Sequence, residues 1–255
     1  MDLFFEYDVE RLRRYAGVAE NTGKISIESY PTHLLLSFTE VGYFNYCVCH
    51  EPVEIADVVG QANVFYASRS IHHHKLLLDE ARSDETQHRF LLENGYRLKE
   101  KLMAVEDPTL QYRPQPIPES LHLERVQAAT LPDFTEDYLA AFESEQKNTA
   151  PVVINFGQLL DNENIALFRV RDQAEPVGIA VLYGIESDFF LAGGAILPAF
   201  RNRGYHTTAL VTRLNWANAQ NARRIISWAY DGGASYRNML KVGLTPYKCY
   251  RLYER

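Results

Sequence analysis

One glycine-ended loop decides the fold, and it reads Gly194-Ala195-Ile196-Leu197-Pro198-Ala199-Phe200-Arg201-Asn202-Arg203-Gly204-Tyr205-His206-Thr207-Thr208. The apolar residues before Pro198 predict a strand, and the residues after Gly204 predict the first turn of a helix. A helix start has unpaired N–H groups and a partial positive charge, so it attracts anions. Gly204 removes the side chain where the backbone must come close to a ligand. With Arg201 and Arg203 adding charge, the segment predicts a phosphate-binding turn.

The sequence around this loop predicts alternating strands and helices. Strands are expected over Leu121–Val126, Ile165–Arg171, Val177–Tyr183, Phe189–Leu197, Arg224–Ala229 and Leu244–Tyr253. Helices are expected over Leu131–Phe142, over Tyr205–Asn221 and from Ser235 to Val242-Gly243. The pair Gly193-Gly194 inside a strand predicts a bulge or a close backbone approach. This pattern favours an α/β (α+β) fold with a mixed sheet.

A proline-rich stretch divides the chain. Prolines at alternate positions in Pro114-Gln115-Pro116-Ile117-Pro118 favour an extended linker, so we expect two parts, 1–110 and 111–255. Each part ends in a helix, a glycine and a strand, and Gly95–Glu106 and Gly243–Glu254 are equal in length and alike in pattern. The similarity predicts two copies of one fold; the alternative is chance, since such units are common.

Composition narrows the class of protein. Apolar residues make up 46% of the 255, which is enough to fill a core and excludes wholesale disorder. No apolar run is long enough to span a bilayer, and the first residues do not resemble an export signal. Cys47, Cys49 and Cys249 are too few and odd in number for a disulfide framework, which favours a reducing cytoplasm.

Charge is uneven along the chain. The formal net charge is −7, yet residues 201–255 hold ten basic residues against two acidic ones, a net of +8. Such a segment suggests attraction for a phosphorylated cofactor, with an ordinary solvated face as the alternative. Nucleic acid is not an expected partner, because the whole chain is acidic.

The loop resembles the acetyl-CoA motif of the GNAT (Gcn5-related N-acetyltransferase) superfamily. In that motif a strand with Val or Ile is followed by Pro and then by Arg/Gln-x-x-Gly-x-Gly/Ala at a helix start. Ile196, Pro198, Arg201 and Gly204 fall on this pattern in register. A second family signature, a short helix ending in Lys-x-Gly-Phe, is similar to Lys241-Val242-Gly243-Leu244.

The resemblance covers residues 121–255 and implies the GNAT acyl-CoA N-acyltransferase fold. With the internal similarity, it implies two GNAT-like domains. The first, residues 1–110, would be a degenerate copy without a cofactor loop that helps to shape the acceptor pocket. The second, residues 111–255, would bind acetyl-CoA.

The resemblance also implies how each residue of the second part would contact acetyl-CoA. The backbone of Ala195, Ile196 and Leu197 would pair with the pantetheine amides. The pyrophosphate would be cradled by Asn202, Arg203, Gly204, Tyr205, His206 and Thr207. Ser235 and Tyr236 would lie near the acyl-thioester end.

Three positions depart from the family pattern. His206 stands where the family prefers Gly or Ala. Met239 stands where many members carry the tyrosine thought to protonate the leaving thiolate, and Phe190 where one branch carries a catalytic glutamate. The resemblance therefore supports cofactor binding better than it supports any catalytic residue.

Two other residues are candidates for the proton transfers of amine acylation. Tyr236 lies three residues before Met239 on the same helical face and could protonate the thiolate; the alternative is a packed aromatic. Asp188 shares a strand face with Phe190 and could act as a base; the alternative is a solvated acid in a turn. Orientation alone can supply much of the rate, so the lack of a clear base does not exclude activity.

We therefore expect a cytoplasmic acyltransferase that moves an acetyl group from acetyl-CoA to a primary amine of a small-molecule or amino-acid-like acceptor. The alternatives are a non-catalytic acyl-CoA-binding regulatory module and a structural α/β protein whose basic face is incidental. No metal is expected, because His72-His73-His74 has no spaced partner residues. No membrane partner is expected, and a homodimer is left open.

Overall fold

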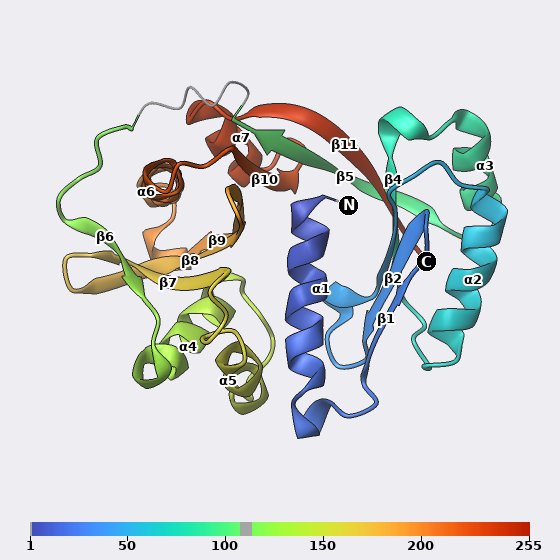
Figure 1. Cartoon of the computed structure of the whole chain (residues 1–255), viewed down its shortest axis with the longest axis horizontal. Coiled ribbons are helices and arrows are strands. Elements are labelled where there is room, and N and C mark those ends of the chain that lie inside the picture. The colour runs from blue at the N-terminus through green and yellow to red at the C-terminus, as the bar shows by residue number, and fades with distance from the viewer. Residues whose placement is uncertain (1, 108–113) are drawn as a thin grey trace. The chain divides into compact units, whose positions relative to one another are not determined.

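The computed structural model describes residues 2–107 and 114–255 and shows a mixed α/β fold (Figure 1). The chain forms two compact units. Unit 1 comprises Met1–Ala104, Ala229–Asp231 and Pro246–Arg255, and unit 2 comprises Val105–Trp228 and Gly232–Thr245. The expected boundary at residue 110 lies outside the described residues. A contiguous division would place Pro246–Arg255 in the second part, whereas these residues group with unit 1.

Unit 1 is a sheet with helices on both faces. Its elements are α1 (Leu3–Ala16), β1 (Ile25–Ser29), β2 (His33–Phe38), β3 (Tyr46–Cys49), α2 (Ile55–Ala67), β4 (Lys75–Asp79), α3 (Glu85–Glu93), β5 (Arg97–Glu106) and β11 (Thr245–Glu254). The strand order is β1-β2-β3-β4-β11-β5. Helix α1 lies on one face, and α2 and α3 lie on the other (Figure 1). The core between α2, α3 and the sheet includes Cys47 and Cys49 of β3 and Tyr66 of α2.

Unit 2 has the same layered plan. Its elements are β6 (Leu121–Arg125), α4 (Leu131–Ala141), α5 (Ala150–Gly157), β7 (Ile165–Asp172), β8 (Glu175–Ile185), β9 (Asp188–Ile196), α6 (Tyr205–Ala219), β10 (Arg224–Tyr230) and α7 (Ala234–Lys241). The strand order is β10-β9-β8-β7-β6; only the β9–β10 pair is parallel. Helices α6 and α7 cover one face, and α4 and α5 cover the other (Figure 1). Of these elements, the sequence prediction missed α5.

The predicted helix–glycine–strand repeat is confirmed. Helices α3 and α7 each end before a glycine with positive φ, 85° at Gly95 and 97° at Gly243. After each glycine, the next N–H donates to a carbonyl five residues earlier: Tyr96 to Leu91 and Leu244 to Met239, both at 3.0 to 3.1 Å. This is the pattern in which a left-handed residue closes a helix end. Each turn leads into a strand of ten residues, β5 or β11.

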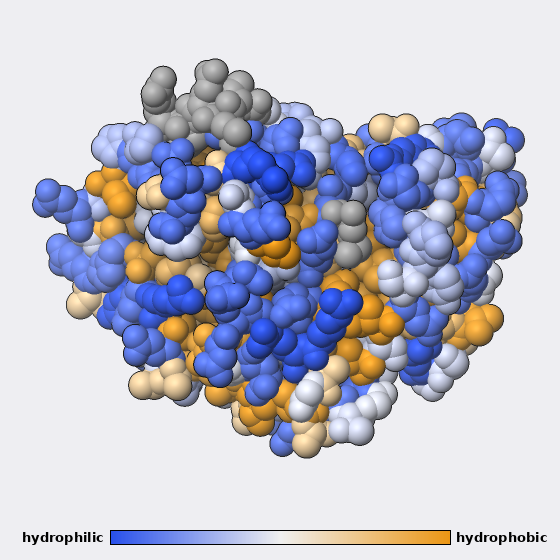
Figure 2. All heavy atoms as spheres, viewed as in Figure 1, coloured by the Kyte–Doolittle hydropathy of each residue, from blue (hydrophilic) through white to orange (hydrophobic). Residues whose placement is uncertain are grey.

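On the face shown in Figure 2, hydrophilic side chains are interspersed with apolar ones. Within the described ranges, no helix is long and apolar enough to cross a membrane.

Candidate functional site

The parallel strands of unit 2 part from each other. Strand β10 pairs with β9 from Arg224–Asp188 to Ile226–Phe190, and the pairing stops there although both strands continue. At that point the Ser227 hydroxyl donates to the Leu191 carbonyl at 2.8 Å. In unit 1, by contrast, β3 pairs with β4 along its full length. We call the separated segments, residues 191–196 of β9 and 227–228 of β10, the strand fork.

A β-bulge in β9 accompanies the fork. Leu182 pairs with Leu191 and Ala180 with Gly194, so Val181 of β8 faces both Ala192 and Gly193. The bulge predicted from the glycine pair is confirmed. Bulges bend a strand and increase its twist, which is consistent with the divergence of β9 from β10.

Arg213 of α6 fills the space beneath the bulge. Its guanidinium is buried and its Nη1 donates to the carbonyls of Val181 (3.0 Å) and Ala192 (3.1 Å). A Cβ built on Gly194 would lie 2.7 Å from Arg213 Nη2, so the close approach expected at this glycine is also present. Desolvation lowers the pKa of Arg213 to about 10.

Sequence reasoning missed this role and counted Arg213 with the basic segment. The available signal was its position within the apolar stripe of α6, between Leu210 and Leu214, both of which are buried.

The predicted strand–turn–helix around Gly204 is present. Gly204 caps α6 in the left-handed region, with φ 86°, and a Cβ built on it would meet no atom within 4 Å. The Thr208 N–H donates to the Gly204 carbonyl at 3.0 Å, so the amides of Tyr205, His206 and Thr207 precede the first intrahelical bond. Asn202 also has positive φ, 63°. The open turn and its amides fit an anionic ligand.

Arg201 has a different place from the one expected. Its Nη1 lies 2.7 Å from Glu143 Oε2, its Nη2 donates to the Ala141 carbonyl at 2.9 Å, and its Nε donates to the Ile196 carbonyl at 3.2 Å. The guanidinium therefore joins the loop to the end of α4 instead of pointing into the turn. The N–H groups of the Arg201 guanidinium are therefore already hydrogen-bonded to three acceptors of the protein.

Two neighbouring side chains of the loop differ in their surroundings. Arg203 is exposed, its guanidinium 5.5 Å from the centre of the Phe200 ring, and it forms no ion pair with the described residues. Tyr205 donates its hydroxyl proton to Asp172 at 2.6 Å. Of the two arginines in the loop, Arg203 is the one that could meet a phosphate.

The backbone of β9 presents alternate residues to the fork. The Leu197 N–H donates to Val177 of β8 at 3.0 Å, so by strand alternation Ala195 also faces β8. The N–H and C=O groups of Gly194 and Ile196 face the other way, toward the fork. Of the three residues expected to pair with the pantetheine amides, Ile196 is the one whose backbone faces the fork, and its carbonyl already accepts from Arg201 Nε at 3.2 Å.

His206 reaches from α6 to α7. Its Nε2 lies 3.5 Å from Ser235 Oγ, and its Nδ1 lies 3.3 Å from the side-chain nitrogen of Asn238. Burial, and then the charge of Arg213, lower the pKa of His206 to about 4, opposed by a hydrogen bond to the Gly194 backbone. The imidazole is therefore neutral at physiological pH and lies beside the fork.

The structure thus brings His206 and Ser235, two predicted site residues, into one group. It adds Asn238, which sequence reasoning missed, although it lies one helical turn after Ser235 and therefore on the same face of α7.

The two catalytic candidates lie in different places. Asp188 is the first residue of β9. It forms a bidentate ion pair with Arg223, in which both hydrogen bonds measure 2.9 Å. Five residues separate it from Gly193, roughly 17 Å along an extended strand. The structure therefore does not bring Asp188 to the bulge. Tyr236 lies half-buried in the first turn of α7, next to Ser235, and its catalytic role stays a prediction.

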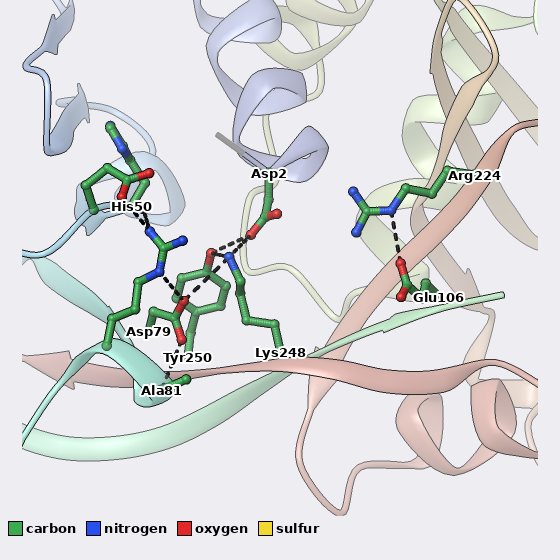
Figure 3. Close-up of polar contacts among 10 residues, drawn as sticks. Asp2, His50, Asp79, Ala81, Glu106, Arg224, Lys248 and Tyr250 are labelled. Carbon is green, nitrogen blue, oxygen red and sulfur yellow. Dashed lines mark hydrogen bonds and ion pairs between the residues drawn. The ribbon is translucent and has the colours of Figure 1, made fainter. Parts of the chain in front are cut away.

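Much of the positive charge of residues 201–255 is balanced by acids from other segments. In unit 1, Lys248 lies 3.0 Å from Asp2 and 3.5 Å from Asp79, and in unit 2 Arg224 lies 3.0 Å from Glu106 (Figure 3). The +8 of this segment therefore overstates the charge available to a phosphate. Tertiary pairing corrects the charge argument made from the sequence.

Among the described residues, no group of His, Cys, Asp and Glu is arranged to hold a metal ion. Of the three consecutive histidines, His74 is buried, with its Nε2 2.7 Å from the Tyr96 hydroxyl and its ring stacked on Tyr66.

Comparison with known families identifies the domain that contains this site. Residues 124–243 match the model of the acetyltransferase (GNAT) family. The chain carries a GNAT acetyltransferase domain. The GNAT domain includes the bulged strand β9, the Gly204 turn, Arg213 and the His206–Ser235–Asn238 group. A search of curated proteins gave no match.

Solved structures show the same fold over nearly the whole chain. A GCN5-related N-acetyltransferase from Kribbella flavida has a TM-score of 0.68 at 14% identity, covering 100% of this chain and 96% of that one. A GCN5-related N-acetyltransferase from Sphaerobacter thermophilus has a TM-score of 0.65 at 14% identity, covering 97% and 84%. A tandem GNAT protein from the clavulanic acid biosynthesis pathway has a TM-score of 0.62 at 9% identity, covering 97% and 95%. The fold is therefore that of GNAT proteins, in a two-domain arrangement.

Proposed function

We propose that this protein is an N-acetyltransferase that moves an acetyl group from acetyl-CoA to a primary amine of a small-molecule or amino-acid-like acceptor. The family match and the shared fold support N-acetyltransferase activity in general. The observation that carries the choice of donor is the open Gly204 turn at the end of a bulged strand that has parted from its neighbour.

The residues present fit acetyl-CoA. The amides at the start of α6 and the exposed Arg203 would hold the phosphates, because a helix start binds anions through its own N–H groups. The outward N–H group of Ile196 would pair with the pantetheine arm, while the Ile196 carbonyl accepts from Arg201 Nε and the Gly194 backbone bonds His206. Bound there, acetyl-CoA supplies a thioester, an acyl group activated for transfer to nitrogen.

The two units differ at the corresponding helix start. Helix α2 follows β3 as α6 follows β9, but its cap residue is Glu54, with a negative φ of −75°. A carboxylate at a helix start competes with a phosphate for the same positive end. This supports a degenerate first domain that binds no donor. We place the protein in the cytoplasm, where its three free cysteines would stay reduced.

Thermal shift and thiol release test the proposal together. Acetyl-CoA and CoA should both raise the melting temperature, since a ligand that binds only the folded state stabilises it. A panel of primary amines should then release free thiol from acetyl-CoA with formation of the acetylamide. No melting shift with either ligand would sink the proposed donor site.

The second candidate, a non-catalytic acyl-CoA-binding regulatory module, is favoured by Met239 and Phe190. Both are buried apolar residues at positions where related enzymes carry an acid or a base. The same experiment separates the two functions. A melting shift without thiol release for any amine would favour the regulatory module.

A further inference from the structure

The imidazole of His206 contacts both strand β9 and helix α7. Toward β9, it forms a hydrogen bond with the Gly194 backbone. Toward α7, its Nε2 lies 3.5 Å from Ser235 Oγ, and its Nδ1 lies 3.3 Å from the side-chain nitrogen of Asn238. One side chain of α6 therefore bridges the parted segment of β9 and the helix that follows β10.

Helical periodicity places this side chain on the inner face of α6. His206 lies three residues before Ala209 and seven before Arg213, both of which are buried against the sheet side of the helix. The GNAT pattern has glycine or alanine at this position, and this chain has histidine. The inner face of the first turn therefore carries an aromatic ring where the pattern has a methyl group or no side chain.

The ring lies on the path that the proposed donor would take. The phosphates would lie at the amides of Tyr205, His206 and Thr207, and the pantetheine arm would pair with the Ile196 N–H. From Ile196 toward the bulge, the next residue of β9 that faces the fork is Gly194, because successive residues of a strand face opposite ways. The Gly194 backbone is already bonded to His206. An arm that continues to the bulge must therefore displace the imidazole.

We propose that His206 is a gate residue that determines the affinity for acyl-CoA, because its imidazole must rotate away from Gly194 and α7 before the pantetheine arm can lie along β9. The inference rests on the proposed acetyl-CoA site. It gives the two parts of His206 opposite effects on the donor. The backbone amide favours binding at the phosphate turn, and the side chain opposes binding at the fork.

The ring is held weakly enough to move. Its contacts with α7, at 3.3 and 3.5 Å, are longer than the about 2.7–3.2 Å of ordinary hydrogen bonds. Rotation about χ1 is also open to it, since a helical side chain is otherwise restricted by the preceding turn, and no helical turn precedes the second residue of α6. Weak hydrogen bonds to three partners favour the bridging position by about ten-fold, and the apparent affinity for the donor falls by the same factor.

Calorimetric titration of the full-length protein with CoA tests the inference. His206→Ala should bind CoA about ten-fold more tightly than the wild type, because no ring has to be displaced. The control His122→Ala, which removes an exposed histidine from β6 of the same unit, should bind CoA as the wild type does. Weaker binding by His206→Ala would mean that the ring helps to hold CoA, and would overturn the inference.

Titration with ADP separates the pantetheine arm from the phosphates. ADP carries a diphosphate and has no arm, so the phosphate turn can hold it while the imidazole stays in place. The wild type and His206→Ala should therefore bind ADP with equal affinity. A gain for ADP as large as the gain for CoA would place the effect in the turn itself and contradict the gate.

A double-mutant cycle tests whether the contact with α7 acts through the ring. Asn238→Ala removes one partner of the imidazole and should tighten CoA binding by about two- to five-fold in the wild-type background. In the His206→Ala background the same substitution should change nothing, since both act on one side chain. Equal gains in the two backgrounds would show that Asn238 acts independently of His206, against the inference.

Two results distinguish this inference from the proposed function. If the wild type and His206→Ala bind CoA with equal affinity, His206 is not a gate and the proposed donor site stands. If neither protein binds CoA, the proposed function itself fails.

Discussion

Arg201 and Glu143 form an ion pair, with 2.7 Å between Nη1 and Oε2, that ties the glycine loop to the second residue after helix α4. Glu143 has a positive φ of 51°, which is uncommon for a residue other than glycine. Between Ala141 and Glu143, both contacted by Arg201, lies Phe142, whose ring approaches the bulge to within 4.0 Å of a Cβ built on Gly193. Arg201 therefore fixes both neighbours of a half-exposed aromatic ring beside the bulge.

Replacing Arg201 by lysine distinguishes geometry from charge. An ammonium group keeps the positive charge but cannot span three acceptors as a guanidinium does. We expect Arg201→Lys to lower the melting temperature and weaken CoA binding as much as Arg201→Gln does. Calorimetric titration with CoA checks this. If Arg201→Lys binds CoA with wild-type affinity and Arg201→Gln does not, the positive charge at position 201, and not the geometry of the guanidinium, determines CoA binding.

Gly204 and Gly95 have similar backbone angles and similar free space around them, so Gly95 can serve as the control position for a substitution at Gly204. Both have nearly the same positive φ, 86° and 85°, and a Cβ would meet no atom closer than 3.9 Å at either. Alanine at each position should therefore cost a similar amount of stability, about 1–2 kcal/mol for a left-handed L-residue. Only Gly204→Ala should also weaken CoA binding, because only there would the methyl group enter the donor turn. Equal CoA affinity in the two variants would remove the turn from the site.

The bulge glycines should respond unequally to alanine. At Gly194 a Cβ would lie 2.7 Å from the buried guanidinium of Arg213, whereas at Gly193 the nearest atoms are 3.9 and 4.0 Å away. Gly194→Ala should lower the free energy of unfolding by about 1–3 kcal/mol, as other overpacked cores do. Gly193→Ala should stay close to wild type. The free energy of unfolding of both variants can be measured by urea denaturation. Equal values would mean that the Arg213 side chain moves aside to accommodate the new methyl group.

Acid should destabilise the protein partly through His206. Burial lowers its pKa from 6.5 to about 4, so between these values the unfolded chain binds a proton that the folded chain does not. Stability is therefore lost as pH falls from about 6.5 to about 4, by at most about 3 kcal/mol for this group. The pKa of His74 is lowered to about 4 as well, mainly by burial, and adds a similar loss.

His206→Gln, which cannot take up the proton, should reduce the drop in melting temperature between neutral pH and about pH 5. Differential scanning calorimetry at the two pH values measures it, with the exposed His73 replaced by Gln as the control. A drop as large as that of the wild type would mean that His206 already titrates normally in the folded protein.

The sequence by itself determined the local features. The turn into α6 needs Gly204 because its backbone is left-handed, and Gly95 and Gly243 end their helices for the same reason. The glycine pair in β9 predicted the bulge, and the family pattern predicted the GNAT fold. Such features depend on the backbone angles of single residues and on the spacing of apolar residues, both of which are determined by residues close together in the chain.

Only the tertiary structure decided where charges and polar groups pair. From the sequence, Arg201 was expected at the phosphate turn and Arg213 was counted only as part of the basic segment, but Arg201 bonds the last carbonyl of α4 and Arg213 bonds carbonyls at the bulge. Asp188 is engaged by Arg223, and His206 meets Asn238 across two helices. Such pairings join residues distant in the chain, and their energy depends on burial and distance, which no local pattern encodes.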